Sequence, residues 1–181
     1  MKNIKYLILS LFTVISLGAC VENDNDELTG GATTGGLLSV NNQLISYVVG
    51  SGATYVATGS VFQGREQTTS IDIYKSFTNN TTGSVSNEVL LKTITIGDTT
   101  MGTTFGFDLT FTYEELITDL TIDGAPLPAN DGNLNIGDYW SLRYASNTSE
   151  GDLNFNAKTT KVAVGTRYAG VYTVEDSSYF R

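Results

Sequence analysis

Short segments in which apolar and polar residues alternate recur along the chain, and they constrain the fold more than any other feature. In residues 105–111, the side chains of Phe105, Phe107, Leu109 and Phe111 fall on one side, because successive side chains of a strand point to opposite faces. Turn-forming Gly, Asn, Asp, Ser and Thr residues separate such segments at fairly regular spacing. The pattern predicts seven strands, at residues 44–49, 54–62, 70–77, 89–96, 105–111, 139–144 and 160–164.

Seven short strands without a β-α-β alternation predict an all-β fold, an antiparallel β-sandwich over residues 37–165. Within it, Ile71, Ile73 and Lys75 are predicted to share one face of a strand. Cys20 is the only cysteine of the chain, so an intramolecular disulfide is excluded. A domain of this size buries close to two-thirds of its unfolded surface, which is enough for stability through the core.

One segment, residues 112–120, has a helical pattern. Thr112 is suited to be the N-cap, and Glu115 follows at the spacing of a capping box. The apolar residues of the segment share a face at helical spacing; they are Tyr113, Leu116, Ile117 and Leu120. We expect one or two helical turns connecting two strands.

Residues 138–147 resemble the penultimate strand of a fibronectin type III or related immunoglobulin-like domain. Such strands carry alternating large inward residues, which here would be Trp140, Leu142 and Tyr144. The resemblance implies that the antiparallel sandwich of about seven strands is immunoglobulin-like. It extends only to the wider sandwich family, because the disulfide-and-tryptophan pattern of antibody domains is absent.

The chain begins with the three parts of a secretory signal, which are a lysine-containing start, an apolar run at residues 6–17 and a small pair at residues 18–19. The apolar run is too short to span a bilayer, which takes about 20 apolar residues. Residues 17–20 (LGAC) resemble the bacterial lipobox, which implies a lipoprotein signal peptide at residues 1–19 and acylation of Cys20. The acyl chains would anchor the protein to a lipid bilayer. The alternative is an ordinary secretory signal followed by a chance cysteine.

Residues 20–36 are acidic and then rich in Gly and Thr, without apolar periodicity, and are predicted to be a flexible tether. The acidic residues at its start resemble the export signal of Bacteroidota lipoproteins that reach the cell surface; they are Glu22, Asp24, Asp26 and Glu27. The resemblance implies an outer-membrane, lipid-anchored protein on the cell surface. The alternative is a solvated linker whose charges have no role. At the other end, residues 166–181 are predicted to be the start of a further module or a truncated tail.

Charge argues against one class of partner. The whole chain has a net charge of −9. Without residues 1–19 it would hold eight basic and nineteen acidic side chains, a net charge of −11. Neutralisation of phosphates by Lys and Arg supplies most of the affinity of proteins for nucleic acid, so nucleic acid is not expected as a partner.

The residue types also argue against catalysis. The chain contains no histidine, which excludes Ser-His-Asp catalysis and the usual general base near neutral pH. A carboxylate pair could still act as in glycosidases, and the candidates are Glu114 with Glu115 and Asp119 with Asp123. Adjacent helical positions do not face each other, so these acids are expected on the solvated surface. The prediction is a protein that is not an enzyme and has no cofactor.

The sequence contains candidate residues for two kinds of binding site, a metal site and a glycan site. Residues 131–138 place oxygen ligands at alternate positions, as calcium loops do, but Ile136 and Leu142 stand where an EF-hand needs Gly and Glu. A turn is the favoured interpretation and no metal site is expected. Glycan binding needs exposed aromatic rings with carboxylates or amides beside them, and the ligand-binding residues stay unknown. Trp140 is expected in the core, and the candidate surface rings are Tyr74, Tyr139, Tyr168, Tyr172 and Tyr179.

The order of lipobox, acidic start, Gly/Thr-rich tether and one sandwich is similar to surface lipoproteins of Bacteroidota nutrient-uptake systems, in particular the starch-utilisation accessory lipoproteins. The similarity implies a non-catalytic spacer or docking module in an outer-membrane glycan or nutrient uptake system. Its partners would be an outer-membrane transporter complex or a glycan. The alternative is an adhesin-like or structural cell-surface protein.

Overall fold

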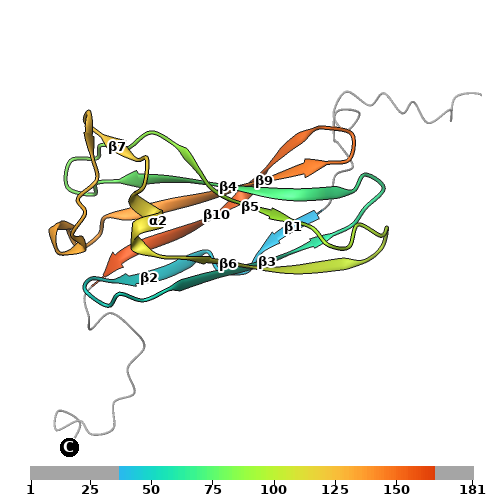
Figure 1. Ribbon diagram of the computed structural model, residues 1–181, viewed down its shortest axis with the longest axis horizontal. Helices are drawn as coiled ribbons and strands as arrows, with labels where there is room; N and C mark the ends of the chain where they lie inside the picture. The colour runs from blue at the N-terminus through green and yellow to red at the C-terminus, as the bar shows by residue number, and fades with distance from the viewer. Residues whose placement is uncertain (1–36, 166–181) are drawn as a thin grey trace, which may run out of the picture. The chain divides into compact units, whose positions relative to one another are not determined.

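A computed structural model describes residues 37–165, and these residues form an all-β fold in two main layers (Figure 1). The first layer is a three-stranded antiparallel sheet in the order β1-β3-β6, with β1 at Leu37–Val40, β3 at Tyr55–Phe62 and β6 at Thr104–Phe111. Because β3 lies in the middle, β1 and β6 are its two edge strands. No helix among the described residues is long and apolar enough to span a bilayer.

The second layer is a five-stranded sheet in the order β2-β10-β9-β4-β5. Its strands are β2 (Leu44–Val48), β10 (Leu153–Gly165), β9 (Tyr139–Thr148), β4 (Thr68–Thr78) and β5 (Val89–Thr95). Four of them pair in antiparallel fashion, but β2 runs parallel to β10, with Leu44 opposite Lys161 and Val48 opposite Gly165. The prediction of a purely antiparallel sandwich is therefore wrong at this pair.

The parallel pair has a simple cause in the chain path. Only residues 41–43 separate β1 from β2, and the chain crosses from one sheet to the other there without reversing its direction. Strand β2 thus continues in the direction of β1 and meets β10, which runs the same way. The described residues hold ten strands, not about seven, because β1 and the two-residue strands β7 (Thr121–Ile122) and β8 (Ala125–Pro126) add to the predicted set.

The core lies between the two sheets and consists of the inward faces that alternation predicts. On β6, Phe107, Leu109 and Phe111 are buried, and on β9 the side chains of Trp140, Leu142 and Tyr144 are fully buried. Burial of large apolar side chains contributes roughly 1.5–3 kcal/mol each. These strands therefore supply much of the stability of a domain without disulfides.

The predicted helical turn is also present, as α2 at Tyr113–Ile117. Thr112 is its N-cap, and both hydrogen bonds of the capping box with Glu115 are formed. The other end of α2 is capped from the core, since the ammonium of Lys75 donates to the carbonyl oxygens of Glu115 and Thr118. This is why a lysine occupies the inward face of β4 beside Ile73, where it is only 2% exposed. Burial lowers the pKa of Lys75, and the charges of Asp119 and Glu115 oppose that shift.

Candidate functional site

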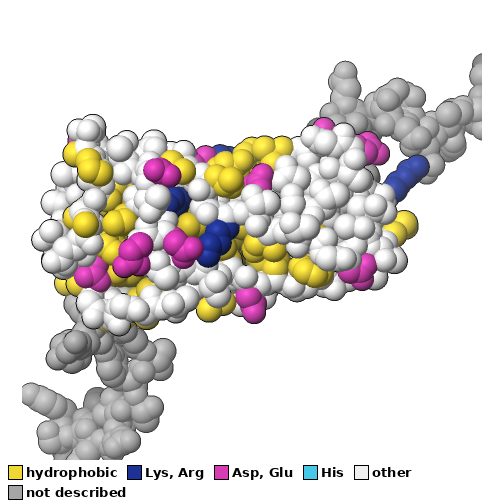
Figure 2. All heavy atoms as spheres, in the orientation of Figure 1, with side chains coloured by type: hydrophobic (Ala, Val, Ile, Leu, Met, Phe, Trp, Pro, Cys, Tyr) yellow, Lys and Arg dark blue, Asp and Glu magenta, His cyan; other side chains and the backbone are white. Residues whose placement is uncertain are grey.

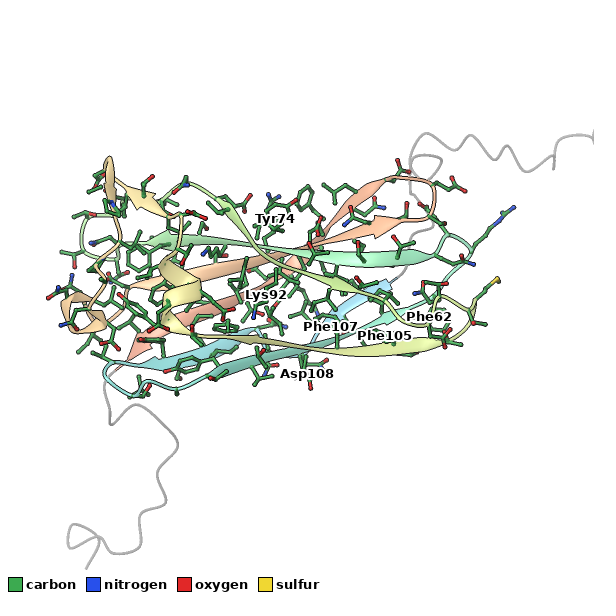
Figure 3. The ribbon with its side chains drawn as sticks, in the orientation of Figure 1. Phe62, Tyr74, Lys92, Phe105, Phe107 and Asp108 are labelled. Carbon is green, nitrogen blue, oxygen red and sulfur yellow. The ribbon has the colours of Figure 1, made fainter. Side chains whose placement is uncertain are left out.

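The outward face of the five-stranded sheet carries a cluster of aromatic, aliphatic and guanidinium side chains, here called the outer-face cluster. Its members are Tyr74 on β4, Leu90 on β5, Arg143 on β9 and Phe155 on β10. Strand register brings them together, because Tyr74 lies opposite both Leu90 and Arg143. The rings of Tyr74 and Phe155 are 6.1 Å apart between centroids. Figure 3 labels Tyr74 on β4.

Arg143 occupies the centre of the outer-face cluster and is held from two sides. Its guanidinium carbon lies 3.8 Å from the centroid of the Phe155 ring and 5.8 Å from that of Tyr74, both within cation–π range. Two of its nitrogens donate to the two carboxylate oxygens of Glu88. This hydrogen bonding with Glu88 raises the pKa of Arg143 above its usual value. The planar group is thus fixed in orientation before any ligand arrives.

A polar network borders the outer-face cluster on the same face. The carboxylate of Asp72 accepts hydrogen bonds from the hydroxyl of Thr93 at 2.6 Å and from the amide of Asn147 at 2.9 Å. The same amide of Asn147 lies 3.1 Å from the hydroxyl of Ser70. These contacts join β5, β4 and β9 through side-chain hydrogen bonds.

The outer-face cluster is accessible to a partner. Phe155 is 48% exposed and Leu90 is 46% exposed, while Leu153 at the start of β10 adds a further exposed apolar side chain. Aromatic and arginine side chains dominate the energetically important centres of protein interfaces, and polar residues form their rims. The composition and order of this face fit a docking surface.

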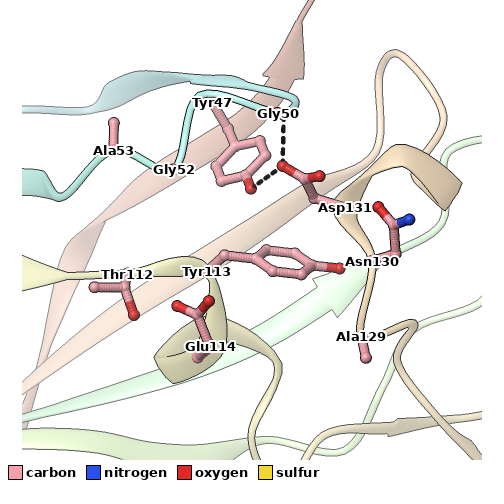
Figure 4. A pocket seen from close by; sticks show the side chains of 10 residues that line it. All are labelled: Tyr47, Gly50, Gly52, Ala53, Thr112, Tyr113, Glu114, Ala129, Asn130 and Asp131. Carbon is pink, nitrogen blue, oxygen red and sulfur yellow. Dashed lines mark hydrogen bonds between the residues drawn. The ribbon is translucent and has the colours of Figure 1, made fainter.

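A pocket of about 460 Å³ lies at one end of the domain, where the β2–β3 connection, α2 and the loop before η2 (Asp131–Asn133) meet (Figure 4). One carboxylate oxygen of Asp131 accepts a hydrogen bond from the hydroxyl of Tyr47 at 2.8 Å and one from the backbone N–H of Gly50 at 2.7 Å. These bonds tie two loops together across the pocket. Glu114 and Asn130 complete its polar wall.

The pocket offers little aromatic surface to a ligand. Tyr47 is 2% exposed and Tyr113 is 9% exposed, so their ring faces are covered by the core. Burial raises the pKa of Tyr113 to about 12 and raises that of Tyr47 further, where the hydrogen bond with Asp131 adds to the effect. Both phenols thus stay protonated near neutral pH. None of the described residues that line the pocket is Lys or Arg, so it is ill suited to an anion.

The structure describes two of the candidate glycan-binding tyrosines and the predicted core tryptophan. Tyr74 belongs to the outer-face cluster, and Tyr139 is half-buried with the ammonium of Lys161 4.0 Å from its ring centroid. Trp140 is fully buried, as predicted. Tyr168, Tyr172 and Tyr179 lie outside the described residues, as do the lipid-attachment residue Cys20 and the acidic export residues Glu22, Asp24, Asp26 and Glu27.

The acidic candidates for catalysis lie in different surroundings. Glu114 lines the pocket, whereas the carboxylate of Glu115 forms a salt bridge with Lys92 at 2.8 Å and accepts from the backbone N–H of Thr112. Glu115 lies at the surface with 39% of its side chain exposed, but it is engaged by this ion pair and by the helix N-cap. Asp119 and Asp123 both have positive φ and lie in the turns around β7, a conformation that Asp tolerates better than most residues.

The segment that resembles a calcium loop forms a turn in the structure. Asn130 caps η2, and Asp131 faces Tyr47 and Gly50 as described. The two carboxylate oxygens of Asp138 accept from the backbone N–H groups of Asn80 and Asn135. Within residues 37–165, no three Asp, Glu, His or Cys side chains gather as metal ligands would.

Sequence reasoning did not find Arg143 and Phe155. The segment 153–158 alternates apolar Leu153 and Phe155 with two asparagines and lies outside the seven predicted strands. Two features were the signal that could have revealed the cluster. They are the alternation at Leu153 and Phe155 and the outward position of Arg143 between the inward Leu142 and Tyr144.

Comparisons with known proteins give no family. No family model matches the chain, and no curated protein matches it. Among solved structures, the sporulation control protein Spo0M from Bacillus subtilis aligns with a TM-score of 0.41 and 12% sequence identity. The alignment covers 72% of this chain and 48% of that chain, so this chain spans about half the length of Spo0M. A likeness at this level does not assign a fold family or a function.

Proposed function

We propose that the protein is a non-catalytic, lipid-anchored surface module that acts as a spacer or docking element in an outer-membrane glycan or nutrient uptake system. The observation that carries the proposal is the outer-face cluster, an exposed group of aromatic and arginine side chains on the outward face of the five-stranded sheet. A surface of this kind supports docking to another protein. Acyl chains on Cys20 would hold the module at the outer membrane.

We further propose that the domain is an immunoglobulin-like sandwich. In such domains strands A, B and E belong to one sheet and strands G, F, C and C′ to the other. The orders β1-β3-β6 and β10-β9-β4-β5 support this assignment, with β5 in the place of C′. The first sheet of an immunoglobulin constant domain also holds a strand D beside E, and no described strand takes that place next to β6.

A non-catalytic role is supported by the chemistry of the side chains. The chain has no histidine. The carboxylate best placed on α2, Glu115, is engaged by Lys92 and by the helix N-cap. A glycosidase requires a pair of carboxyl groups that are free to act as acid and as base or nucleophile. Glu115 is not free in this sense.

Anchoring is tested on the full chain in a Bacteroidota host. We expect radiolabelled palmitate to be incorporated and the protein to sediment with envelopes, and we expect both properties to be lost in Cys20→Ala. The proposed lipid anchor would be contradicted if the wild type incorporated no palmitate. It would also be contradicted if Cys20→Ala still sedimented with envelopes.

Docking is tested separately, by cross-linking on intact cells and affinity purification of the tagged chain. We expect the wild type to recover a component of an outer-membrane transporter and Phe155→Ser to lose it. Phe62→Ser is the matched control, because Phe62 is a similarly exposed phenylalanine (42%) on the three-stranded sheet. Recovery of no transporter component, or equal recovery with all three proteins, would refute the docking role.

A further inference from the structure

Strand β6 presents a free edge to one side of the domain. It pairs with β3, and no other described strand lies on its far side. In an antiparallel pair, hydrogen-bonded and non-hydrogen-bonded positions alternate. The backbone N–H of Gln63 donates to the carbonyl of Thr103, and Lys92 approaches the carbonyl of Thr110 from outside. Odd-numbered residues of β6 thus bond to β3, and Thr104, Gly106 and Asp108 direct their backbone groups outward.

This edge lacks the features that protect edge strands in natural proteins, such as short length, bulges, lysines and prolines. Strand β6 has eight residues in unbroken register with β3 and contains neither Lys nor Pro. The other edges differ. Strand β5 has an irregularity opposite Ile73 and Tyr74 and carries Lys92, while β1 and β2 have four and five residues. Among the described strands, β6 is therefore the edge best suited to pair with another chain.

An apolar hollow lies beside the free edge, between β5 and β6. Figure 2 shows hydrophobic side chains in this gap between the two layers, and Figure 3 shows Phe105 and Phe107 pointing toward it. Phe105 on β6 and Ile94 on β5 point inward but are only partly buried. The core is thus incompletely covered on this side.

Lys92 limits the length of the opening. Its ammonium donates to the carbonyl of Thr110 at 2.6 Å and contacts the carboxylate of Glu115 at 2.8 Å. The outward carbonyl of Thr110, at the end of β6 next to α2, is therefore already hydrogen-bonded and not available to a partner strand. The stretch that remains free for pairing runs over residues 104–108.

We propose that this stretch of β6 receives an extended segment of a partner protein, which adds as a strand and places apolar side chains at alternate positions into the hollow. An extended polypeptide is the ligand that can satisfy a row of outward N–H and C=O groups. The segment is basic, because Asp108 is exposed on β6 and the chain has a net charge of −9. The same charge opposes edge-to-edge pairing of two copies.

The test is selection of random 12-residue peptides on the immobilised full chain, followed by affinity measurement with the enriched peptides. We expect these peptides to alternate apolar residues with others and to carry a net positive charge. Gly106→Pro should weaken binding about tenfold or more, because it removes an outward N–H donor. The change breaks no bond to β3, and proline is tolerated on edge strands.

Gly106→Ala is the matched control, since it keeps the N–H and its Cβ meets open space; its affinity should stay within about twofold of the wild type. Asp108→Lys changes only an exposed side chain and tests the charge selection independently of the proline variant. It should weaken binding severalfold, more at low salt than at high salt. Bound peptide should also slow hydrogen exchange at Gly106 and Asp108.

Three results would overturn the proposal. The first is an absence of enriched peptides, and the second is peptides that bind wild type and Gly106→Pro equally. The third is a concentration-dependent dimer in sedimentation that Gly106→Pro abolishes, since it would make a second copy the occupant. The proposal is independent of the outer-face cluster, so Phe155→Ser should leave peptide affinity unchanged.

Discussion

The two lateral sides of the domain are closed in different ways. On the side of β1, β2 and β10, here called the closed flank, the chain itself crosses between the sheets, and buried or half-buried polar groups bond across them. The amide of Asn156 donates to the carbonyl of Leu38 at 2.8 Å, and the hydroxyl of Thr160 donates to the carbonyl of Asn42. On the side of β5 and β6, here called the open side, Lys92 and α2 provide the described polar connection.

The difference shows that the contacts that stabilise the fold and the surface that is free to bind a partner can lie on different sides of one domain. Hydrogen bonds of buried groups on the closed flank are costly to break, because an unpaired buried donor or acceptor loses about 1–3 kcal/mol. The partly exposed ion pair on the open side contributes little, in the range of about 0–1 kcal/mol. The open side can therefore change its contacts without endangering the fold.

The largest effect is expected for Thr160→Val on the closed flank. The Thr160 hydroxyl is buried, bonds to the hydroxyl of Tyr144 at 2.8 Å and donates to the carbonyl of Asn42. The substitution keeps the shape and leaves two groups without a partner, so the free energy of unfolding should fall by about 2–3 kcal/mol in urea titrations. Thr159→Val, at the exposed neighbouring position, should change it by less than about 0.5 kcal/mol. Equal losses of stability in Thr160→Val and Thr159→Val would contradict the claim that buried hydrogen bonds stabilise the closed flank.

A smaller effect is expected for Asn42→Ala, at the crossing between β1 and β2. The side-chain oxygen of Asn42 accepts from the backbone N–H of Thr58 at 2.8 Å and from its hydroxyl at 3.0 Å. Removing it should cost about 1–2 kcal/mol, measured by thermal or urea unfolding. Asn41→Ala is the control, because Asn41 is exposed and bonds only to the Thr58 hydroxyl through its side chain. A larger loss of unfolding free energy in Asn41→Ala than in Asn42→Ala would contradict the stabilising role given to the Asn42 side chain.

The open side should respond least. Lys92→Met is expected to lower the free energy of unfolding by less than about 1 kcal/mol at pH 7, because both partners of the ion pair are partly exposed. The hydrogen bond with Lys92 lowers the pKa of Glu115 below its usual value of 4.5. The contribution of the pair is therefore fully present above that value and is lost as the pH falls through the lowered pKa.

The pH dependence gives the measurement. Urea unfolding of wild type and Lys92→Met should differ by a constant amount from pH 7 to pH 5, and the difference should shrink on further acidification. A difference of more than about 2 kcal/mol, or one that grows in acid, would show that the open side is as important for stability as the closed flank.

Several elements could be predicted because they depend on local pattern. The alternation of Phe107, Leu109 and Phe111 identifies β6 and its buried face, since a one-residue shift would expose all three. The spacing of Thr112 and Glu115 identifies α2, because the capping box is formed within one turn. That Lys75 shares a face with Ile71 and Ile73 was also predicted, although its burial and its role as a cap of α2 were not.

Other features depend on contacts between distant residues and were not predicted. Alternation shows that residues 44–49 form a strand but not that β2 runs parallel to β10, which is some 110 residues later. The outer-face cluster depends on the register of β4, β9 and β10, and a shift in register between Phe155 and Thr159 brings Phe155 under Arg143. Composition contains no information on such a register shift.

The most direct test of the difference between the two sides is residue-resolved amide hydrogen exchange of the full chain at neutral pH, without added peptide. The outward N–H groups of Gly106 and Asp108 should exchange rapidly, whereas the N–H groups of Phe107 and Leu109, which bond to β3, should be strongly protected. Protection of Gly106 and Asp108 equal to that of their neighbours would mean that the edge of β6 is already covered, and would contradict the open side.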